Sequence, residues 1–153
     1  MSTNRSLIDT GTAMVKGVEQ AIKMFAVENN ATDNIQVVKE AFCNEFTRDE
    51  RRAEFTRINA KYPDRIPVIC ERAFNASLPQ VDKRKFLVPR DITAGQFLYI
   101  VRQRIKLQSS EAMFIFVNGV LPNTTASMEQ VYAAHKNEDG FLYMTYSGEN
   151  TFG

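Results

Sequence analysis

Few side chains in this sequence are of the types that carry covalent or acid–base chemistry. Its 153 residues include two cysteines, Cys43 and Cys70, and one histidine, His135. These residues form no nucleophile–base motif and lack the spacing of zinc ligands, and no glycine-rich phosphate loop occurs. Cys70 lies in an apolar stretch typical of a strand, and His135 at the end of an expected helix. We therefore predict that the protein is not an enzyme and has no catalytic residues, metal site or cofactor.

The segment from Lys85 to Val88 could instead act through its backbone. Its sequence, KFLV, is typical of a short strand that Pro89 ends. Side chains alternate across a strand, so Lys85 and Leu87 are expected on one face, and Phe86 and Val88 on the other. If this strand is a sheet edge, its free amide and carbonyl groups can pair with an extended peptide. The alternative is a core strand flanked by solvated charges.

The overall composition argues against several classes of protein. The formal net charge is +1, so no broad field favours nucleic acid as a partner. Two cysteines are too few for a disulfide framework, which indicates a reducing, cytoplasmic setting. No apolar run approaches the roughly 20 residues of a membrane span, and the N-terminus lacks the layout of a signal peptide. Any membrane attachment is therefore expected to be acquired.

Helical periodicity dominates the first third of the chain. Apolar residues recur at helical spacing over 13–27 and 33–44, and a third helix is expected over 48–61, before Pro63. The first two helices are expected to pack against the core or each other, and the alternative is a partner-binding or membrane-surface role. We divide the chain into a partly helical N-terminal extension, 1–41, and a domain, 42–153.

The remainder alternates between strand and helix signals. Strands are expected over 66–72, 85–88, 112–117 and 141–146, and the nearly all-apolar third strand is expected to be central. Thr93 and Gln96 form a capping-box pair at the start of one helix, and Ser127 caps a shorter one. Asn118-Gly119 is a turn signal. This order predicts an α+β fold, the ubiquitin-like β-grasp, in which one helix crosses a four-strand mixed sheet.

Several stretches also carry a family resemblance. They are KYPDRIPVICE at 61–71, DKRKFLVP at 82–89, the helix from Gly95 to Ile105, FIFVN at 114–118 and DGFLYMTYS at 139–147. Together they closely resemble the autophagy-related protein eight family, which includes GABARAP and the microtubule-associated light-chain-three proteins. The resemblance spans about Phe42 to Gly153. Residues 1–40 match nothing in the family, and 46–50 differs from its usual segment.

The resemblance implies that the chain is a modifier carried on Gly153. Family members are activated at a C-terminal glycine by an activating enzyme and passed by a conjugating enzyme to phosphatidylethanolamine. A cysteine protease later removes the lipid. Glycine suits this chemistry because, lacking a Cβ, it threads narrow active sites. The implied location is the cytoplasm, and the autophagosomal membrane after lipidation. The alternative is an unconjugated peptide-binding adaptor in vesicle trafficking or microtubule association.

The resemblance further implies two pockets beside the 85–88 strand for cargo receptors with acidic aromatic-x-x-aliphatic motifs. The first, for the aromatic residue, would be lined by Ile58, Pro67, Lys85, Leu87 and Phe141. The second, for the aliphatic residue, would be lined by Phe86, Val88, Pro89, Ile92, Phe97 and Ile100. A basic rim would comprise Arg65, Lys83, Arg84 and Arg104. The basic helix 48–61 could also contact acidic tubulin tails, although a solvated helix face is the favoured interpretation.

Three roles are open for residues 1–40. They could cover the groove or the core as an autoinhibitory segment, form a separate interaction arm, or be an extension with little role. No aromatic-x-x-aliphatic motif flanked by acidic residues occurs among them. Mimicry of a family ligand is therefore not expected.

Overall fold

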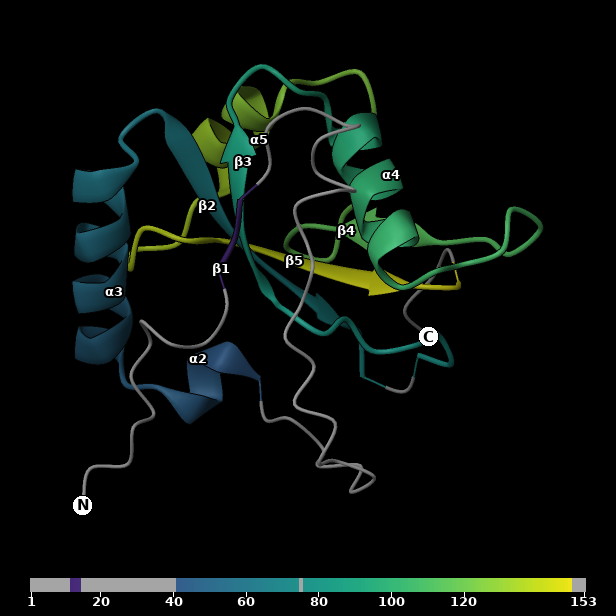
Figure 1. The fold of residues 1–153 in the computed structure, drawn as a ribbon, viewed down its shortest axis with the longest axis horizontal. Helices are drawn as coiled ribbons and strands as arrows, with labels where there is room; N and C mark the ends of the chain where they lie inside the picture. The colour runs from purple at the N-terminus through teal and green to yellow at the C-terminus, as the bar shows by residue number, and fades with distance from the viewer. Residues whose placement is uncertain (1–11, 15–40, 75, 150–153) are drawn as a thin grey trace.

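The computed structural model describes residues 12–14, 41–74 and 76–149. A single mixed sheet lies between helices on its two faces (Figure 1). In chain order the elements are β1 Thr12–Met14, α2 Phe42–Glu45, α3 Arg48–Lys61, β2 Arg65–Arg72, β3 Lys85–Pro89, α4 Ala94–Arg104, β4 Phe114–Phe116, α5 Met128–His135 and β5 Leu142–Ser147. Within these described ranges, no helix combines the length and apolarity needed to cross a bilayer.

The strands lie in the order β1-β3-β2-β5-β4. β2 and β3 form an antiparallel hairpin, β2 and β5 are parallel neighbours inside the sheet, and β4 pairs antiparallel with β5. The predicted four-strand mixed sheet with a crossing helix, the ubiquitin-like fold, is thus confirmed. A fifth strand, β1, adds to the free edge of β3.

Two predictions about the elements are wrong. Ala13 and Met14 were expected to begin a helix but lie in strand β1, because a partner edge overrides weak local preference. The rest of that helix and residues 33–40 of the next fall outside the described residues. β4 is an edge strand, not a central one. Its apolar run is explained by burial on both faces, since the neighbouring Ile115 and Phe116 are both buried.

Among the helices that the structure describes, three begin with a capping box. The predicted pair, Thr93 and Gln96, is confirmed at α4, and Ser127 caps α5. Thr47 and Glu50 form a third pair at α3, within the stretch that departs from the family pattern. Each such cap contributes about 1 kcal/mol to stability.

The sheet divides the core into two clusters. The larger, between the sheet and helices α4 and α5, includes Phe86, Val88 and Phe97. The smaller, between the sheet and helices α2 and α3, includes Phe42 and Leu87. We refer to them as the α4-side and α3-side clusters. Because β3 contributes alternate side chains to both, its predicted alternation is seen directly in the packing.

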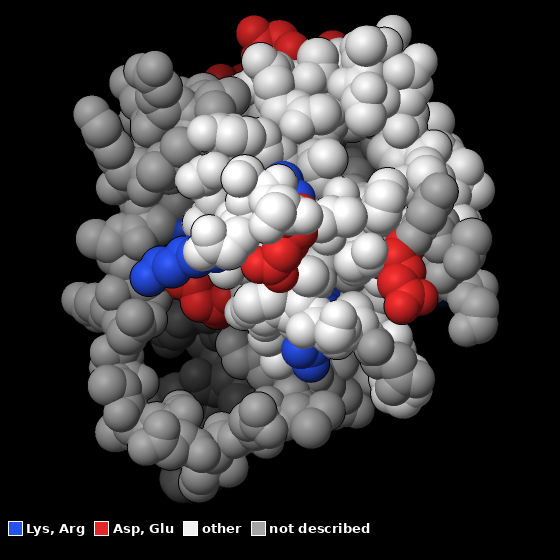
Figure 2. Space-filling model, turned by 90° about the vertical axis from the view of Figure 1, so that its right-hand side faces the viewer, with Lys and Arg blue, Asp and Glu red and all other residues white. Residues whose placement is uncertain are grey.

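The surface on the α4 side of the molecule has few charged groups. Figure 2 shows scattered Lys, Arg, Asp and Glu side chains of both signs among mostly uncharged residues. The sequence from Ala112 to Met128 contains no charged residue. This view therefore shows no continuous basic patch that could attract an acidic ligand.

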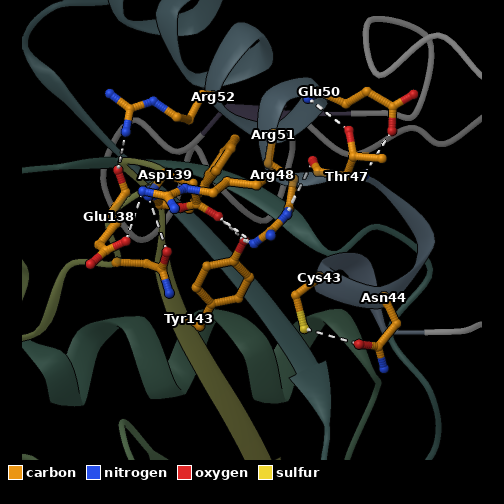
Figure 3. Close-up of polar contacts among 12 residues, drawn as sticks. Cys43, Asn44, Thr47, Arg48, Glu50, Arg51, Arg52, Glu138, Asp139 and Tyr143 are labelled. Carbon is orange, nitrogen blue, oxygen red and sulfur yellow. Dashed lines mark hydrogen bonds and ion pairs between the residues drawn. The ribbon is translucent and has the colours of Figure 1, made fainter.

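Helix α3 is fixed to the turn before β5 by a polar cluster (Figure 3). The Arg51 guanidinium lies 2.8 Å from the buried carboxylate of Asp139, which also accepts a hydrogen bond from the Tyr143 hydroxyl. Burial, and then this contact with Asp139, raise the pKa of Tyr143. Arg52 donates to the Glu138 carbonyl. The turn at 139–140 is thereby held against α3.

Gly140 in that turn should tolerate no side chain. Its φ is +99°, and an added Cβ would lie 2.3 Å from Cγ of Phe55. We expect Gly140→Ala to lower the free energy of unfolding by about 2–4 kcal/mol, from overpacking and backbone strain together. Gly119→Ala is the matched control, because Gly119 has φ +75° and no atom within 4 Å of the added Cβ. Gly119→Ala should lower the free energy of unfolding by about 1 kcal/mol, as measured by urea unfolding of both variants. Equal losses in Gly140→Ala and Gly119→Ala would contradict the role of Phe55.

Candidate peptide-binding edge

The backbone groups of β3 alternate between its two sides. The amide of Cys70 in β2 donates to the carbonyl of Arg84, directly before β3, over 2.8 Å. Because successive residues of a strand direct their amide and carbonyl groups to opposite sides, those of Lys85 and Leu87 point away from β2. Pro67, opposite Leu87, has no amide hydrogen, which agrees with this phase. The outer edge of β3 is therefore formed by the backbone of Lys85 and Leu87.

The residues predicted for the first pocket lie on the α3 side of this edge. Ile58 from α3, Leu87 from β3 and Phe141 before β5 belong to the α3-side cluster. Pro67 is buried opposite Leu87 in the β2–β3 ladder. The ring of Phe141 is edge-on to Phe55, at 6.1 Å between centroids. The four apolar members of the set are thus brought together, and their contact with a ligand stays a prediction.

Lys85, the fifth member, forms a buried ion pair. Its Nζ lies 2.7 Å from the Glu54 carboxylate, and both side chains are 1% exposed. Arg57 contacts the other oxygen of Glu54, also at 2.7 Å. Burial alone would raise the pKa of Glu54, but the hydrogen bonds from Arg57 and Lys85 outweigh it and lower the pKa below its ordinary value. Within the described structure the Lys85 charge is thus directed at α3.

Sequence reasoning missed Glu54. The signal was available, because Glu54 and Ile58 are four residues apart on α3 and so share one helix face. A buried Ile58 therefore implied that Glu54 also faces the sheet. A carboxylate in that position requires a basic partner, and Lys85 supplies it.

The residues predicted for the second pocket lie together on the α4 side. Phe86, Val88, Ile92, Phe97 and Ile100 all belong to the α4-side cluster, and Pro89 is half-buried at the end of β3. Phe86 and Phe97 pack edge-to-face with centroids 5.4 Å apart. All except Pro89 are at least nine-tenths buried, so they form part of the core here. Their contact with a ligand stays a prediction, and it would require a ligand side chain to enter between them and their neighbours.

Two of the four residues of the predicted basic rim, Arg84 and Arg104, are paired with acidic residues of the same chain. Arg84 contacts Glu45 at 2.5 Å and Glu71 at 3.3 Å, and its guanidinium lies over the Phe42 ring. Arg104 is paired with Asp82 at 2.7 Å. Arg65 and Lys83 are half-buried. The sequence prediction counted charges without their acidic neighbours, so it overstated the positive potential offered to a ligand.

The arginines of α3, which were considered for contact with tubulin, also form contacts within the chain. Arg51, Arg52 and Arg57 contact Asp139, the Glu138 carbonyl and Glu54 respectively. Arg48 pairs with Glu138 at the surface. These contacts favour the interpretation of α3 as a structural helix with a solvated face.

The outer edge of β3 is occupied by β1. The two strands run parallel, with Thr12 opposite Lys85, Ala13 opposite Phe86 and Met14 opposite Leu87 (Figure 1). The sequence prediction excluded ligand mimicry because residues 1–40 lack an aromatic-x-x-aliphatic motif. It considered side chains alone, whereas strand addition depends on the backbone.

The residues first considered for chemistry, Cys70, Cys43 and His135, differ in their surroundings. Burial raises the pKa of the Cys70 thiol, and Cys43 is exposed. His135, at the end of α5, contacts the Asn118 side chain at 3.2 Å. Among the described residues, no three His, Cys, Asp or Glu side chains are grouped so that they could hold a metal ion.

Comparison with known proteins identifies relatives of the domain. Residues 50–153 match the family model described as autophagy protein Atg8, ubiquitin-like. Autophagy-related protein 8 of Mycosarcoma maydis is 58% identical over 116 residues, which cover 76% of this chain and 98% of that protein. Autophagy-related protein 8d of Arabidopsis thaliana is 58% identical over 113 residues, covering 74% of this chain and 94% of that protein.

Solved structures give the same result. The crystal structure of Trypanosoma brucei ATG8 has a TM-score of 0.69 and 39% identity, and covers 75% of this chain and 99% of that one. Plasmodium falciparum Atg8, solved in complex with a Plasmodium falciparum Atg3 peptide, has a TM-score of 0.69 and 37% identity, and covers 74% of this chain and 100% of that one.

Proposed function

Because this chain belongs to the Atg8 family of ubiquitin-like autophagy proteins, we propose that it is a modifier conjugated through Gly153 to phosphatidylethanolamine on autophagosomal membranes. In that state it recruits cargo receptors and autophagy machinery by binding short aromatic-x-x-aliphatic peptides as an added strand. The observation that carries the binding half of this proposal is the outer edge of β3. It combines outward-facing backbone groups with an apolar cluster on either side.

The geometry supports recognition through both the backbone and the side chains of a ligand. An extended peptide beside β3 would pair with the amides and carbonyls of Lys85 and Leu87. Its alternate side chains would point to the two faces of the sheet, toward Leu87 on one side and Phe86 on the other. Burial of one aromatic and one aliphatic anchor contributes roughly 1.5–3 kcal/mol each. We expect micromolar affinity.

The same edge is our candidate for contact with the conjugation machinery. The Plasmodium relative, solved in complex with an Atg3 peptide, supports contact with a peptide of that machinery, and the choice of this edge is our proposal. On this proposal the chain supplies the Gly153 carboxylate, and the activating enzyme, the conjugating enzyme and a delipidating cysteine protease supply the catalysis. The protein would be cytoplasmic until lipid attachment places it on the membrane. The remaining alternative, an unconjugated adaptor, uses the same edge without the carboxylate chemistry.

A labelled acidic peptide with an aromatic-x-x-Leu motif tests the proposed edge. Changing either anchor to alanine in the peptide should weaken binding at least about tenfold, because each anchor loses its apolar burial. A peptide of the same composition with adjacent anchors is the control. Bound peptide should shift the amide resonances of Lys85 and Leu87, and not those of Phe114–Phe116 at the opposite edge. Tight binding that ignores the anchors, or shifts confined to β4, would contradict the proposal.

A further inference from the structure

We propose that β1 is an intramolecular competitor of the peptide ligand, so that a ligand gains the edge of β3 only by displacing residues 12–14. This inference rests on the proposed function, because it assigns the same edge to both strands. The structure pairs Thr12–Met14 in parallel with Lys85–Leu87, at the position where an added ligand strand would lie. The chain therefore carries its own occupant for this surface.

The overlap involves the same backbone atoms. Lys85 and Leu87 are the residues whose amides and carbonyls point away from β2, and both lie within the register of β1. In a parallel ladder, a residue pairs with the two neighbours of its register partner. Ala13, in register with Phe86, thus faces the backbone groups of Lys85 and Leu87. A second strand cannot use those groups while β1 holds them.

The backbone nature of the contact explains how a segment without the ligand motif can compete. Strand addition draws on main-chain hydrogen bonds, which any extended non-proline residue can make. Residues 12–14, Thr-Ala-Met, contain neither proline nor charge. A strand that lacks the aromatic and aliphatic anchors can form the backbone hydrogen bonds to β3. It lacks the stabilisation that comes from burying those two side chains. We infer that β1 excludes weak ligands and gives way to ligands that supply both anchors.

Tethering makes this competition independent of protein concentration. β1 belongs to the same chain as β3, so it acts at an effective concentration that dilution does not change. The apparent dissociation constant of a ligand equals its intrinsic value divided by the fraction of molecules in which the edge is open. If β1 leaves the edge open about one-tenth of the time, ligands bind about tenfold more weakly than to an open edge.

A single proline substitution in the full chain tests this. Ala13→Pro removes the amide hydrogen that faces β3, so β1 should be released. Thr12→Pro is the matched control, because the amide of residue 12 faces away from β3 and a strand accepts proline at its first position. We expect Ala13→Pro to bind the acidic aromatic-x-x-Leu peptide about three- to tenfold more tightly than wild type. Thr12→Pro should change affinity by less than about twofold.

Amide hydrogen exchange at Lys85 and Leu87 distinguishes failure of the competition inference from failure of the proposed peptide-binding function. Faster exchange in Ala13→Pro, together with tighter peptide binding, supports the inference. Faster exchange with unchanged, measurable binding shows that β1 occupies the edge without competing, and overturns it. Exchange and affinity that both match wild type would also overturn it. If no variant binds the peptide while exchange still accelerates, the proposed peptide-binding function itself has failed.

Discussion

Removal of Gly153 should abolish transfer of the chain to phosphatidylethanolamine. The expected assay contains activating and conjugating enzymes, ATP and phosphatidylethanolamine liposomes, and detects the lipid adduct by its altered gel mobility. On the proposed function the Gly153 carboxylate passes through enzyme active sites, where a terminal residue without a Cβ would fit and a larger one would clash. β5 ends at Ser147, six residues before Gly153. Those six residues can reach about 20 Å when extended, which would allow the carboxylate to leave the domain.

The control for this experiment is a second glycine near the tail. An added Cβ at Gly148 would have no neighbour closer than 3.6 Å, so Gly148→Ala should fold and conjugate normally. Adduct formation without Gly153 would contradict the modifier proposal. Absence of an adduct from every variant, combined with intact peptide binding, would favour the unconjugated adaptor.

Replacement of Glu54 by alanine should cost about 3–5 kcal/mol of the free energy of unfolding, because it leaves the buried ammonium of Lys85 without its partner. The surface pair of Arg48 and Glu138 provides the matched control. Its two side chains are 61% and 79% exposed, and Glu138→Ala should change stability by less than about 0.5 kcal/mol. Chemical denaturation of both variants checks this. Equal losses of stability in Glu54→Ala and Glu138→Ala would show that burial of the Glu54–Lys85 pair does not increase the cost of breaking it.

A double substitution separates the cost of breaking the pair from the value of the pair itself. Glu54→Leu with Lys85→Met replaces both charges by apolar groups of similar size. Because desolvation offsets most of the attraction in a buried pair, this variant should be about as stable as wild type or more so. Its recovery relative to Glu54→Ala would assign the single-variant loss to an unpaired charge. A loss as large as that of Glu54→Ala would instead indicate that the pair is itself stabilising.

The Glu54 carboxylate should also make stability depend on pH in the acidic range. Its pKa in the folded chain is below the ordinary value, so its stabilising effect is present above the unfolded pKa of about 4.3. That effect is lost as the pH falls through the lower, folded pKa. Between about pH 6 and pH 3, Glu54→Gln should therefore lose less stability than wild type. Parallel curves for the two proteins would contradict this assignment.

Local signals in the sequence were sufficient for most of the domain. The hydroxyl of Thr93 and the amide of Gln96 are three residues apart, so their pairing depends on little else. Asn118 and Gly119 both have positive φ in the predicted turn. The alternation of Phe86 and Leu87 between faces follows from strand geometry alone. These features are set within a few residues, which is why the sequence reveals them.

Features that depend on contacts between residues far apart in the sequence could not be predicted from local sequence patterns. Ala13 and Met14 fit helical periodicity, and only the free edge of β3, more than 70 residues away, makes them a strand. In the sequence, Glu54 is one of several charged residues on a charged helix. Only the position of Lys85 on β3 shows that Glu54 belongs to a buried ion pair. Arg84 was counted as a rim charge although Glu45 and Glu71 neutralise it. The resemblance was sufficient to predict which residues lie together beside β3. It did not predict that β1 pairs with the outer edge of β3.

The position of β5 between β2 and β4 has a consequence for how the chain reaches its native state. The register of β2 with β5 joins Val68 to Leu142 and Arg72 to Tyr146, so the middle of the sheet closes a loop of about half the chain. Such long-range parallel pairing slows folding. A nascent chain still lacking β5 on the ribosome has β2 with one flank unpaired, and its hydrophobic face exposed to aggregation. Folding of the domain must therefore follow, not accompany, synthesis of its last strand.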